Sequence, residues 1–310
     1  MPQLIQRVIA VDWSGDKGPG QRKKIWAGVW TAATGRVQLE TGRNREELIA
    51  WLLHLGAETP RMVVGIDCCF SFPAWFLQEH DCKTVADFWQ QVASGKGEQW
   101  LHRECDDSRF WGVAGTRRTG KRPAQWSGDG LRQMLRTTDF ENKIEPRLEG
   151  GDPARAAKMF GIQAKSPFQI GGSGSVGTGS LRAMPWLLRL QQKGFRVWPF
   201  DSAAITSQHP QPLLLEIYTR LLTGPVKKSN PEARKAYLQQ KKQTEAVLYA
   251  GLSRAVVAAA LTSEDAFDAL VCCLEMVRSR EQFATLHATH DPTVRLEGIT
   301  WRPGVDAVSY

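Results

Sequence analysis

The chain has 310 residues, of which 42% are hydrophobic and 23% are charged. These proportions fit one large or two small globular domains with a hydrophobic core, and they exclude disordered, collagen-like and coiled-coil chains. No stretch approaches the ~18 uncharged apolar residues that a membrane span requires, and the first 15 residues show no basic region followed by a cleavage site. We therefore expect a soluble protein that is not exported and has no membrane partner.

Six cysteines occur in the sequence, and four of them form the adjacent pairs Cys68-Cys69 and Cys272-Cys273 inside apolar runs. Such pairs are typical of reduced, buried thiols rather than of the disulfide framework of a secreted protein. We therefore expect a cytoplasmic location.

The net charge of +8 is concentrated in the middle of the chain. Residues 101–200 contain 17 Lys and Arg against 9 Asp and Glu, whereas residues 1–100 contain 11 of each and residues 201–310 contain 12 of each. A basic block between neutral flanks suggests a surface for a polyanion such as nucleic acid, with a merely solvated basic face as the alternative.

The first part of the chain predicts a meander of three antiparallel strands, over Arg7–Trp13, Lys24–Thr31 and Arg36–Thr41. An amphipathic helix is expected to start after Asn44, with Gly56 available to end it. A buried strand over Arg61–Asp67 comes next.

Residues 73–165 differ in character, because aromatic helical stretches over Ala74–Gln78 and Val85–Val92 lead into a basic tract punctuated by Gly and Asp. We interpret 73–165 as an insertion or lid, and 1–72 with 166–310 as the core. The second part of the core predicts, in order, a helix over Leu181–Gln192, strands over Phe195–Phe200 and Leu213–Tyr218, helices through most of Pro231–Arg280, and one or two added strands in Thr293–Arg302.

Three acidic residues end or interrupt apolar runs. Asp12 follows Ile-Ala-Val, Asp67 follows Val-Val-Gly-Ile, and Glu216 follows three leucines. Acids in such settings are expensive to desolvate unless a positive charge meets them. These three positions are therefore candidates for a functional site.

Asp265 and Asp268 are three residues apart, so both carboxylates lie on one face of a predicted helix that begins after Ser263. Stabilisation of the helix dipole is a simpler explanation for Asp265, but it fits Asp268 less well. If this helix packs across Asp12 and Asp67, the converging carboxylates would favour Mg²⁺ or Mn²⁺. Two such ions about 3.5–4 Å apart would activate a water and stabilise the leaving oxygen of a phosphodiester.

This arrangement resembles the ribonuclease H-like fold, and within it a family of predicted nucleases of unknown function that is similar to Holliday-junction resolvases. The resemblance covers about residues 5–72 and 180–280, and its motifs are Val8–Asp12, Val64–Asp67 with Pro73 following, Leu215–Tyr218 and Asp265–Leu270. It implies an α/β fold with a mixed five-stranded sheet flanked by helices, to which residues 73–165 add a large, mainly helical or loop insertion. It also implies that the matched acids bind metal and cleave nucleic-acid backbones.

We therefore expect a metal-dependent nuclease that acts on DNA or RNA. The expected metal ligands are four aspartates, Asp12, Asp67, Asp265 and Asp268. Glu216 is expected to be a second-tier ligand or a water-orienting group. Contacts to the flanking phosphates are expected from four basic residues of the insertion, Arg117, Arg118, Lys121 and Arg122.

The Gly-rich segment 171–179 leaves other functions open. Gly172–Gly177 fits G-x-G-x-x-G and Asp201 follows the next strand, as in a dinucleotide site, but the preceding strand, Phe168–Ile170, is short and the loop is long. A loop over the acid cluster or a phosphate-binding helix N-terminus is the alternative. An actin-like or sugar-kinase-like ATPase would also place an acid such as Asp12 beside a Gly-containing turn, although only one copy of the core is recognisable.

Two further interpretations concern the insertion. A zinc knot is conceivable from two His and two Cys, His80, Cys82, His102 and Cys105, although their spacing is not one of the strong zinc patterns. The basic residues beside Trp111 and Trp126 would also suit a nucleic-acid-binding module without catalysis.

Overall fold

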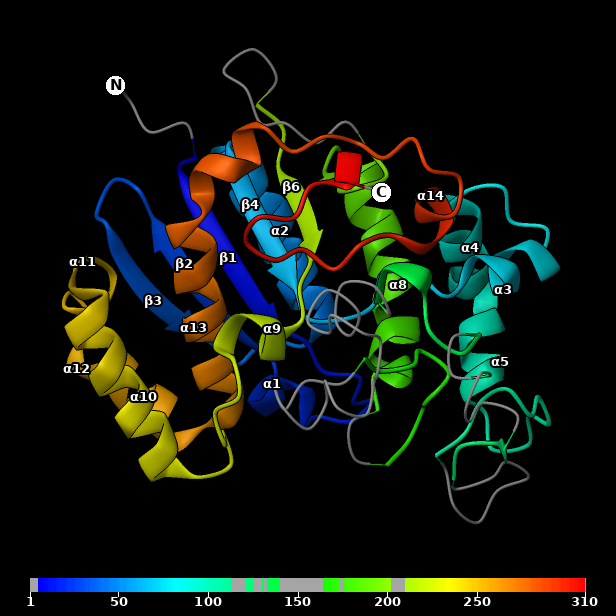
Figure 1. Cartoon of the computed structure of the whole chain (residues 1–310), viewed down its shortest axis with the longest axis horizontal. Helices are drawn as coiled ribbons and strands as arrows, with labels where there is room; N and C mark the ends of the chain where they lie inside the picture. Colours follow the sequence, from blue (N-terminus) through cyan, green and yellow to red (C-terminus); the bar gives the residue numbers. More distant parts are fainter. Residues whose placement is uncertain are drawn as a thin grey trace.

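A computed structural model of the chain describes residues 5–112, 121–124, 130, 133–139, 164–172, 175–201 and 210–309. It shows an α/β protein built on a mixed six-stranded sheet with the strand order β3-β2-β1-β4-β6-β5 (Figure 1). The strands are β1 (Arg7–Asp12), β2 (Trp26–Thr31), β3 (Arg36–Glu40), β4 (Met62–Ile66), β5 (Arg196–Val197) and β6 (Leu213–Glu216). The general α/β class expected from the sequence is confirmed.

The sheet has an antiparallel half and a parallel half. Strands β1, β2 and β3 form the predicted meander, whereas β4 pairs parallel with β1 and β6, and β5 pairs parallel with β6. The sheet has six strands instead of the five that the resemblance implies, because the strand expected over Phe195–Phe200 pairs at its edge as β5. Strand β5 is only two residues long, and Pro199, which has no N–H to donate, follows it closely.

The helices lie on both faces of the sheet. They are α1 (Gln21–Lys24), α2 (Arg45–Glu58), α3 (Ala74–Glu79), α4 (Val85–Gln91), α5 (Gly97–Leu101), α8 (Gly177–Gln192), α9 (Thr219–Thr223), α10 (Pro231–Thr244), α11 (Ala246–Tyr249), α12 (Arg254–Thr262), α13 (Glu264–Arg278) and α14 (Val294–Glu297). A π turn (Val92–Lys96) joins α4 to α5, and short 3₁₀ turns occupy Arg280–Ala284 and Ala307–Ser309. No helix among these described residues is both long and apolar enough to cross a membrane.

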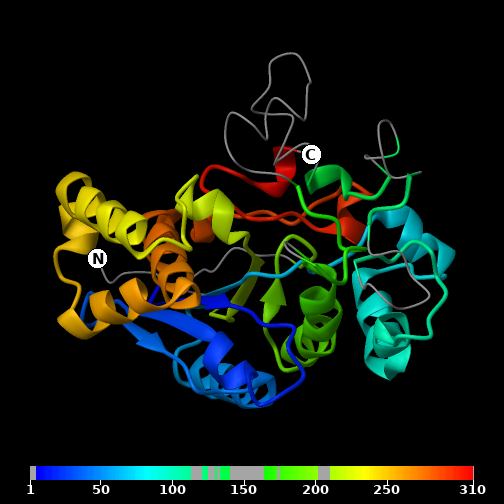
Figure 2. The same cartoon turned by 90° about the horizontal axis from the view of Figure 1, so that it is seen from below.

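Alternate residues of the central strands enter two hydrophobic clusters. Ile9 and Val11 pack with α2 and α8 on one face, whereas Val8 and Ala10 pack with α12 and α13 on the other. Figure 2 shows the yellow and orange helices above the blue strands and the blue helix α2 below them. Because both faces are covered, these strands are continuous apolar runs without polar alternation.

Two glycines let helix α13 approach the sheet closely. A Cβ atom at Gly28 would lie 2.3 Å from the carbonyl oxygen of Ala269, and one at Gly65 would lie 2.8 Å from the sulfur of Met276. Any side chain at these positions would force the helix away. The depth at which α13 packs is therefore set by glycines on strands β2 and β4.

The first part of the 73–165 segment shares the core of the sheet. The ring of Phe76 meets those of Phe88 and Phe168 edge to face, with centroids 6.0 Å and 5.0 Å apart. These rings belong to the same buried cluster as Ile9 and Val11 of β1.

Two local expectations are corrected. Helix α2 continues past Gly56 to Glu58, since Gly56 is buried against Phe195 rather than placed at a helix end. The segment Thr293–Arg302 forms helix α14 instead of strands, because Asp291 Oδ1 accepts hydrogen bonds from the amides of Thr293 and Val294 and so starts a helix. Only Trp301 makes a strand-like bridge, to Ile217.

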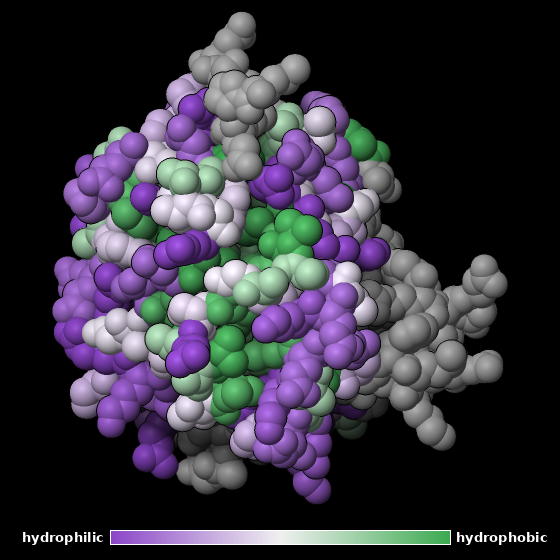
Figure 3. Space-filling view, turned by 90° about the vertical axis from the view of Figure 1, so that its left-hand side faces the viewer, coloured by the Kyte–Doolittle hydropathy of each residue, from purple (hydrophilic) through white to green (hydrophobic). Residues whose placement is uncertain are grey.

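The side of the molecule formed by α10, α11 and α12 presents apolar surface bordered by hydrophilic residues (Figure 3). A groove of about 280 Å³ lies there, lined by Leu238, Tyr249, Leu252 and Val257 with Lys235 and Lys242 at its border. The residues that line this groove belong to α10, α12 and the segment between them, and none belongs to a strand of the sheet.

Candidate functional site

Asp12 and Asp67 lie side by side at the carboxyl edge of the sheet. Val11 of β1 pairs with Ile66 of β4, and the backbone N–H of Asp67 donates to the Val11 carbonyl at 3.0 Å. Parallel neighbours end at the same edge, so the residues that follow the two strands must meet. The juxtaposition expected from the sequence is therefore present.

Helix α13 adds the second pair of acids. Ser263 caps the helix through its hydroxyl, which accepts from the Ala266 amide at 3.2 Å, and this places Asp265 in the first turn. Asp268 follows one turn later and is 5% exposed. Since Asp268 precedes Ala269, the residue packed on Gly28, the close approach of the helix carries this carboxylate to the end of the sheet.

The four carboxyl groups interact with one another. Burial, followed by the charges of Asp268, Asp67 and Asp265, raises the pKa of Asp12 well above its usual value. Burial, followed by the charge of Asp268, raises the pKa of Asp67 to about 6. Burial also raises the pKa values of Asp265 and Asp268. The cluster therefore holds excess negative charge that favours protons or cations.

Local contacts act against this rise in pKa. An interaction with the side chain of Asp12 lowers the pKa of Asp265, against the larger effect of burial. Thr219, the first residue of α9, donates from both its amide and its hydroxyl to Asp67. The sequence contains no motif that would have identified Thr219 as a partner of Asp67.

The positive charge of Lys228 lowers the pKa of all four aspartates. Its ammonium group forms an ion pair with Asp268 Oδ2, and it also attracts Asp12 and Asp67. Lys228 lies on the loop between α9 and α10, 40 residues from Asp268 in sequence. No spacing rule links positions so far apart, so sequence reasoning missed it.

The donor set has the chemistry that a hard divalent cation requires, since carboxylate oxygens are its preferred ligands. Asp268 Oδ1 is buried and has no hydrogen-bond partner among the described atoms. In the described part of the chain, however, no three His, Cys, Asp or Glu side chains come close enough together to hold one metal ion. The oxygen donors and the negative charge of the aspartates thus suit such an ion. One of these oxygens, Asp268 Oδ2, is paired with Lys228.

Glu216 has a different environment from the one expected. Its carboxylate pairs with the Arg136 guanidinium, with Nη1 to Oε2 at 2.7 Å, and it accepts from the Thr300 hydroxyl at 2.6 Å and the Phe70 amide at 2.7 Å. These partners occupy both of its oxygens. The side chain is therefore engaged in a buried ion network, and the expected role of Glu216 as a ligand or a water-orienting group stays a prediction.

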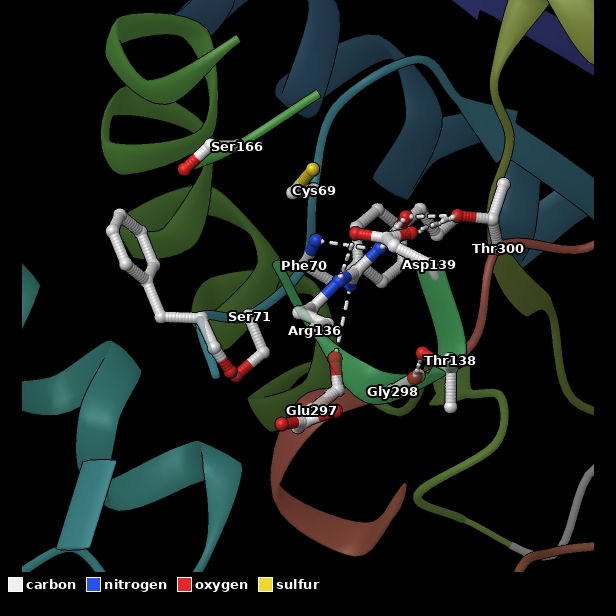
Figure 4. A network of polar contacts seen from close by, with 12 residues as sticks. Cys69, Phe70, Ser71, Arg136, Thr138, Asp139, Ser166, Glu297, Gly298 and Thr300 are labelled. Atoms are coloured by element: carbon white, nitrogen blue, oxygen red, sulfur yellow. Dashed lines mark hydrogen bonds and ion pairs between the residues drawn. The ribbon is translucent and has the colours of Figure 1, made fainter. Parts of the chain in front are cut away.

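Arg136 is the centre of this network, which Figure 4 shows from close by. The residue is fully buried, and its Nε and Nη2 atoms donate to the two oxygens of Asp139, each at 2.9 Å. Nη1 also donates to the Glu297 carbonyl at 2.9 Å. The i, i+3 spacing of Arg136 and Asp139 is the one feature of the sequence that points to this network. The other partner, Glu216, is 80 residues from Arg136, so no local pattern connects the two.

A cavity of about 250 Å³ lies beside Asp67 and Glu216. Gly15, in the loop after β1, meets the first turn of α8 there, since a Cβ atom at Gly15 would lie 2.7 Å from the Gly179 nitrogen. Trp13 fastens the same contact through its indole N–H, which donates to the Gly179 carbonyl at 3.0 Å. The end of the Gly-rich segment therefore lies against the loop that follows Asp12.

The dinucleotide interpretation of that segment is not supported by its surroundings. Gln169 makes a single bridge to Trp111 instead of a strand in the sheet, and helix α8 begins at Gly177. Gly174 and Ser173 lie outside the described residues. The strand–turn–helix context that the fingerprint needs is absent from the described residues around the segment.

The basic residues expected to bind phosphate are only partly described. Lys121 and Arg122 are exposed, whereas Arg117, Arg118 and Trp126 lie outside the described residues. Trp111 is 4% exposed. The Trp111 ring therefore offers little surface for stacking on a nucleobase, as the interpretation of a non-catalytic nucleic-acid-binding module would require.

The proposed zinc knot does not assemble. Nδ1 of His80 contacts the Lys96 ammonium at 2.9 Å, and Cys82 is buried with its thiol near the His80 carbonyl. The described side chains include no His/Cys group of metal-binding geometry. All six cysteines are free thiols, and five of them are buried.

Comparison with known proteins gives no family for this chain. No family model, no curated protein and no solved structure matches it significantly.

Proposed function

We propose that the protein is a metal-dependent phosphodiester hydrolase, a nuclease on a ribonuclease H-like core. The observation that carries the proposal is the gathering of Asp12, Asp67, Asp265 and Asp268, from three separate elements, at one edge of the sheet. Buried carboxylates that repel one another cost stability unless protons or cations compensate for their charge. Carboxylate oxygens are preferred ligands of hard divalent cations such as Mg²⁺ and Mn²⁺.

The topology is consistent with the finer fold proposal. An antiparallel meander of β1, β2 and β3, followed by β4 and β6 parallel to β1, has the order in which the expected core places its strands. The acids on β1 and after β4 lie at adjacent strand ends. The remaining two acids, Asp265 and Asp268, lie on helix α13.

Each group has a definite task in this proposal. Asp12, Asp67, Asp265 and Asp268 would hold the divalent ions, which when bound supply an activated water and neutralise charge on the phosphate. Thr219 orients Asp67 through two hydrogen bonds. The central excess of Lys and Arg, including the exposed Lys121 and Arg122, would hold flanking phosphates of DNA or RNA. The six free thiols fit a reducing compartment such as the cytoplasm.

Cleavage of labelled single-stranded, duplex, hybrid and branched nucleic acids in Mn²⁺, Mg²⁺ or EDTA tests the proposal. Asp12→Asn should abolish metal-dependent cleavage and leave nucleic-acid binding equal or tighter, because it removes a negative charge next to the polyanion. Asp106→Asn, which changes an exposed aspartate after α5, is the matched control and should cut like the wild type. Unchanged cleavage by Asp12→Asn would refute the site.

The cavity beside Asp67 favours one second candidate, hydrolysis of a small nucleotide phosphate. Its volume of about 250 Å³ is slightly below the range for small-molecule sites, roughly 300–1,000 Å³. The contact between the loop after Asp12 and the Gly-rich start of α8 borders it. ATP turnover in the absence of any polynucleotide would favour this candidate over the nuclease.

A further inference from the structure

Lys228 is held at the aspartate cluster by its backbone as well as by its charge. The guanidinium of Arg234, which is 3% exposed, donates to the carbonyl of Lys228 and to that of Leu261 at the end of α12. Asn230 starts α10 two residues later by accepting from the Glu232 amide at 2.9 Å. Arg234 therefore fastens the loop that carries Lys228 to the end of α12, the helix that precedes α13.

The ammonium group of Lys228 meets several carboxylates at once. It is hydrogen-bonded to Asp268 Oδ2, and the charges of Asp268, Asp67 and Asp12 all raise the pKa of Lys228, although burial acts in the opposite direction. A lysine keeps its charge in a partly buried site only where acids compensate for the lost hydration. Lys228 thus supplies positive charge where the aspartates repel one another.

Asp268 is the residue through which this charge acts. It is 5% exposed, with Oδ2 on Lys228 and Oδ1 without a hydrogen-bond partner among the described atoms. A buried carboxylate oxygen without a partner is costly and marks a position for a ligand. The same carboxylate raises the pKa of Asp12 and Asp67, so whatever binds it affects the whole cluster.

We propose that Lys228 is a built-in counter-ion of the aspartate cluster, and that its ammonium must release Asp268 before a divalent cation binds there. This inference rests on the proposed metal-dependent function. The arrangement offsets part of the repulsion among the four aspartates, because the charge of Lys228 acts on each of them. Lys228 thereby lowers the affinity for the ion and stabilises the protein before the ion arrives.

The expected effect follows from the bond that has to be broken. A hydrogen bond between charged groups contributes enough that its removal changes a competing equilibrium by about 10- to 100-fold. Lys228→Met should therefore bind Mn²⁺ about 10- to 100-fold more tightly than the wild type. Lys228→Arg keeps the charge and should stay within a few-fold of the wild type.

Isothermal titration calorimetry of the 310-residue chain with Mn²⁺ measures this affinity directly, without any substrate. Lys227→Met is the matched control, because Lys227 is an exposed neighbour on the same loop. Thermal denaturation in EDTA and in saturating Mn²⁺ accompanies each titration. Lys228→Met should have a lower Tm than the wild type in EDTA and should regain it with Mn²⁺. If Lys228→Met does not fold in either buffer, Lys228→Gln, which can still hydrogen-bond to Asp268, replaces it.

The outcomes separate this inference from the proposed function. Tighter Mn²⁺ binding by the neutral variant, or binding by that variant alone, supports the counter-ion role. Equal or weaker binding by the neutral variant, with a wild type that binds Mn²⁺, overturns the role of Lys228 and leaves the metal site standing. Failure of both proteins to bind Mn²⁺ overturns the proposed metal-dependent function together with the inference that rests on it.

Discussion

Replacement of Arg136 by methionine should be among the most damaging single changes in the described core. Methionine retains much of the volume of the side chain but removes every donor of the guanidinium group. Glu216 and Asp139, at 2% and 0% exposure, would then stay buried without their cation. Glu216 would keep the Phe70 amide and the Thr300 hydroxyl, which compensate for only part of the loss.

The magnitude follows from the cost of an uncompensated buried charge. Removal of one partner of a buried ion pair costs about 3–5 kcal/mol. For a chain of this size each kcal/mol lowers Tm by roughly 2 °C, so Arg136→Met should lower Tm by about 6–10 °C. Glu216→Gln should cost less, about 1–3 kcal/mol, because the amide can still accept from Thr300 or Phe70.

A double-mutant cycle on Arg136→Met and Glu216→Gln, followed by thermal and urea denaturation with tryptophan fluorescence, tests this reasoning. The double variant should lose less stability than the sum of the single variants, because each side chain is costly mainly when the other remains. Arg103→Met, at an exposed position after α5, is the control and should stay within about 0.5 kcal/mol of the wild type.

Two results would refute the structural role of the network. One is an Arg136→Met protein as stable as the wild type. The other is a Glu216→Gln protein that keeps its stability but loses Mn²⁺ binding, since that result would show that Glu216 acts as a metal ligand together with the aspartates.

Three further predictions concern stability. Burial raises the pKa of Glu297 from 4.5 to about 7, so the native state binds this proton more tightly than the unfolded state does. The associated stability, about 3 kcal/mol, is present below pH 4.5 and is lost as the pH rises through 7. Glu297→Gln should therefore flatten the dependence of Tm on pH between 5 and 8, and an unchanged slope would contradict this. Gly28→Ala should cost about 1–3 kcal/mol in urea denaturation because its Cβ would meet the Ala269 carbonyl, whereas Gly251→Ala, with open space around it, should cost little. Asp12→Asn should raise the Tm measured in EDTA at pH 8, because a carboxyl group with a strongly raised pKa is removed, and a lower Tm would argue against repulsion in the cluster.

The local patterns of the sequence were sufficient for most of the secondary structure. Apolar runs bounded by turns predicted β1 to β4, and the capping residues Asn44 and Ser263 predicted where α2 and α13 begin. Where local signals failed, tertiary contacts explain why. Gly56 is buried against Phe195 instead of ending a helix. In the tail, Val294–Glu297 forms a short helix because Asp291 accepts from the amides of Thr293 and Val294.

The candidate site divides in the same way. The sequence alone determined that acids follow two apolar strands and lie on one face of a C-terminal helix, because strand ends and helix periodicity are local properties of the chain. Only the tertiary structure decided which cation each acid meets: Lys228 for Asp268, and Arg136 for Glu216. These pairs join positions 40 and 80 residues apart, and their choice depends on how the loops pack over the sheet edge, which no local pattern encodes.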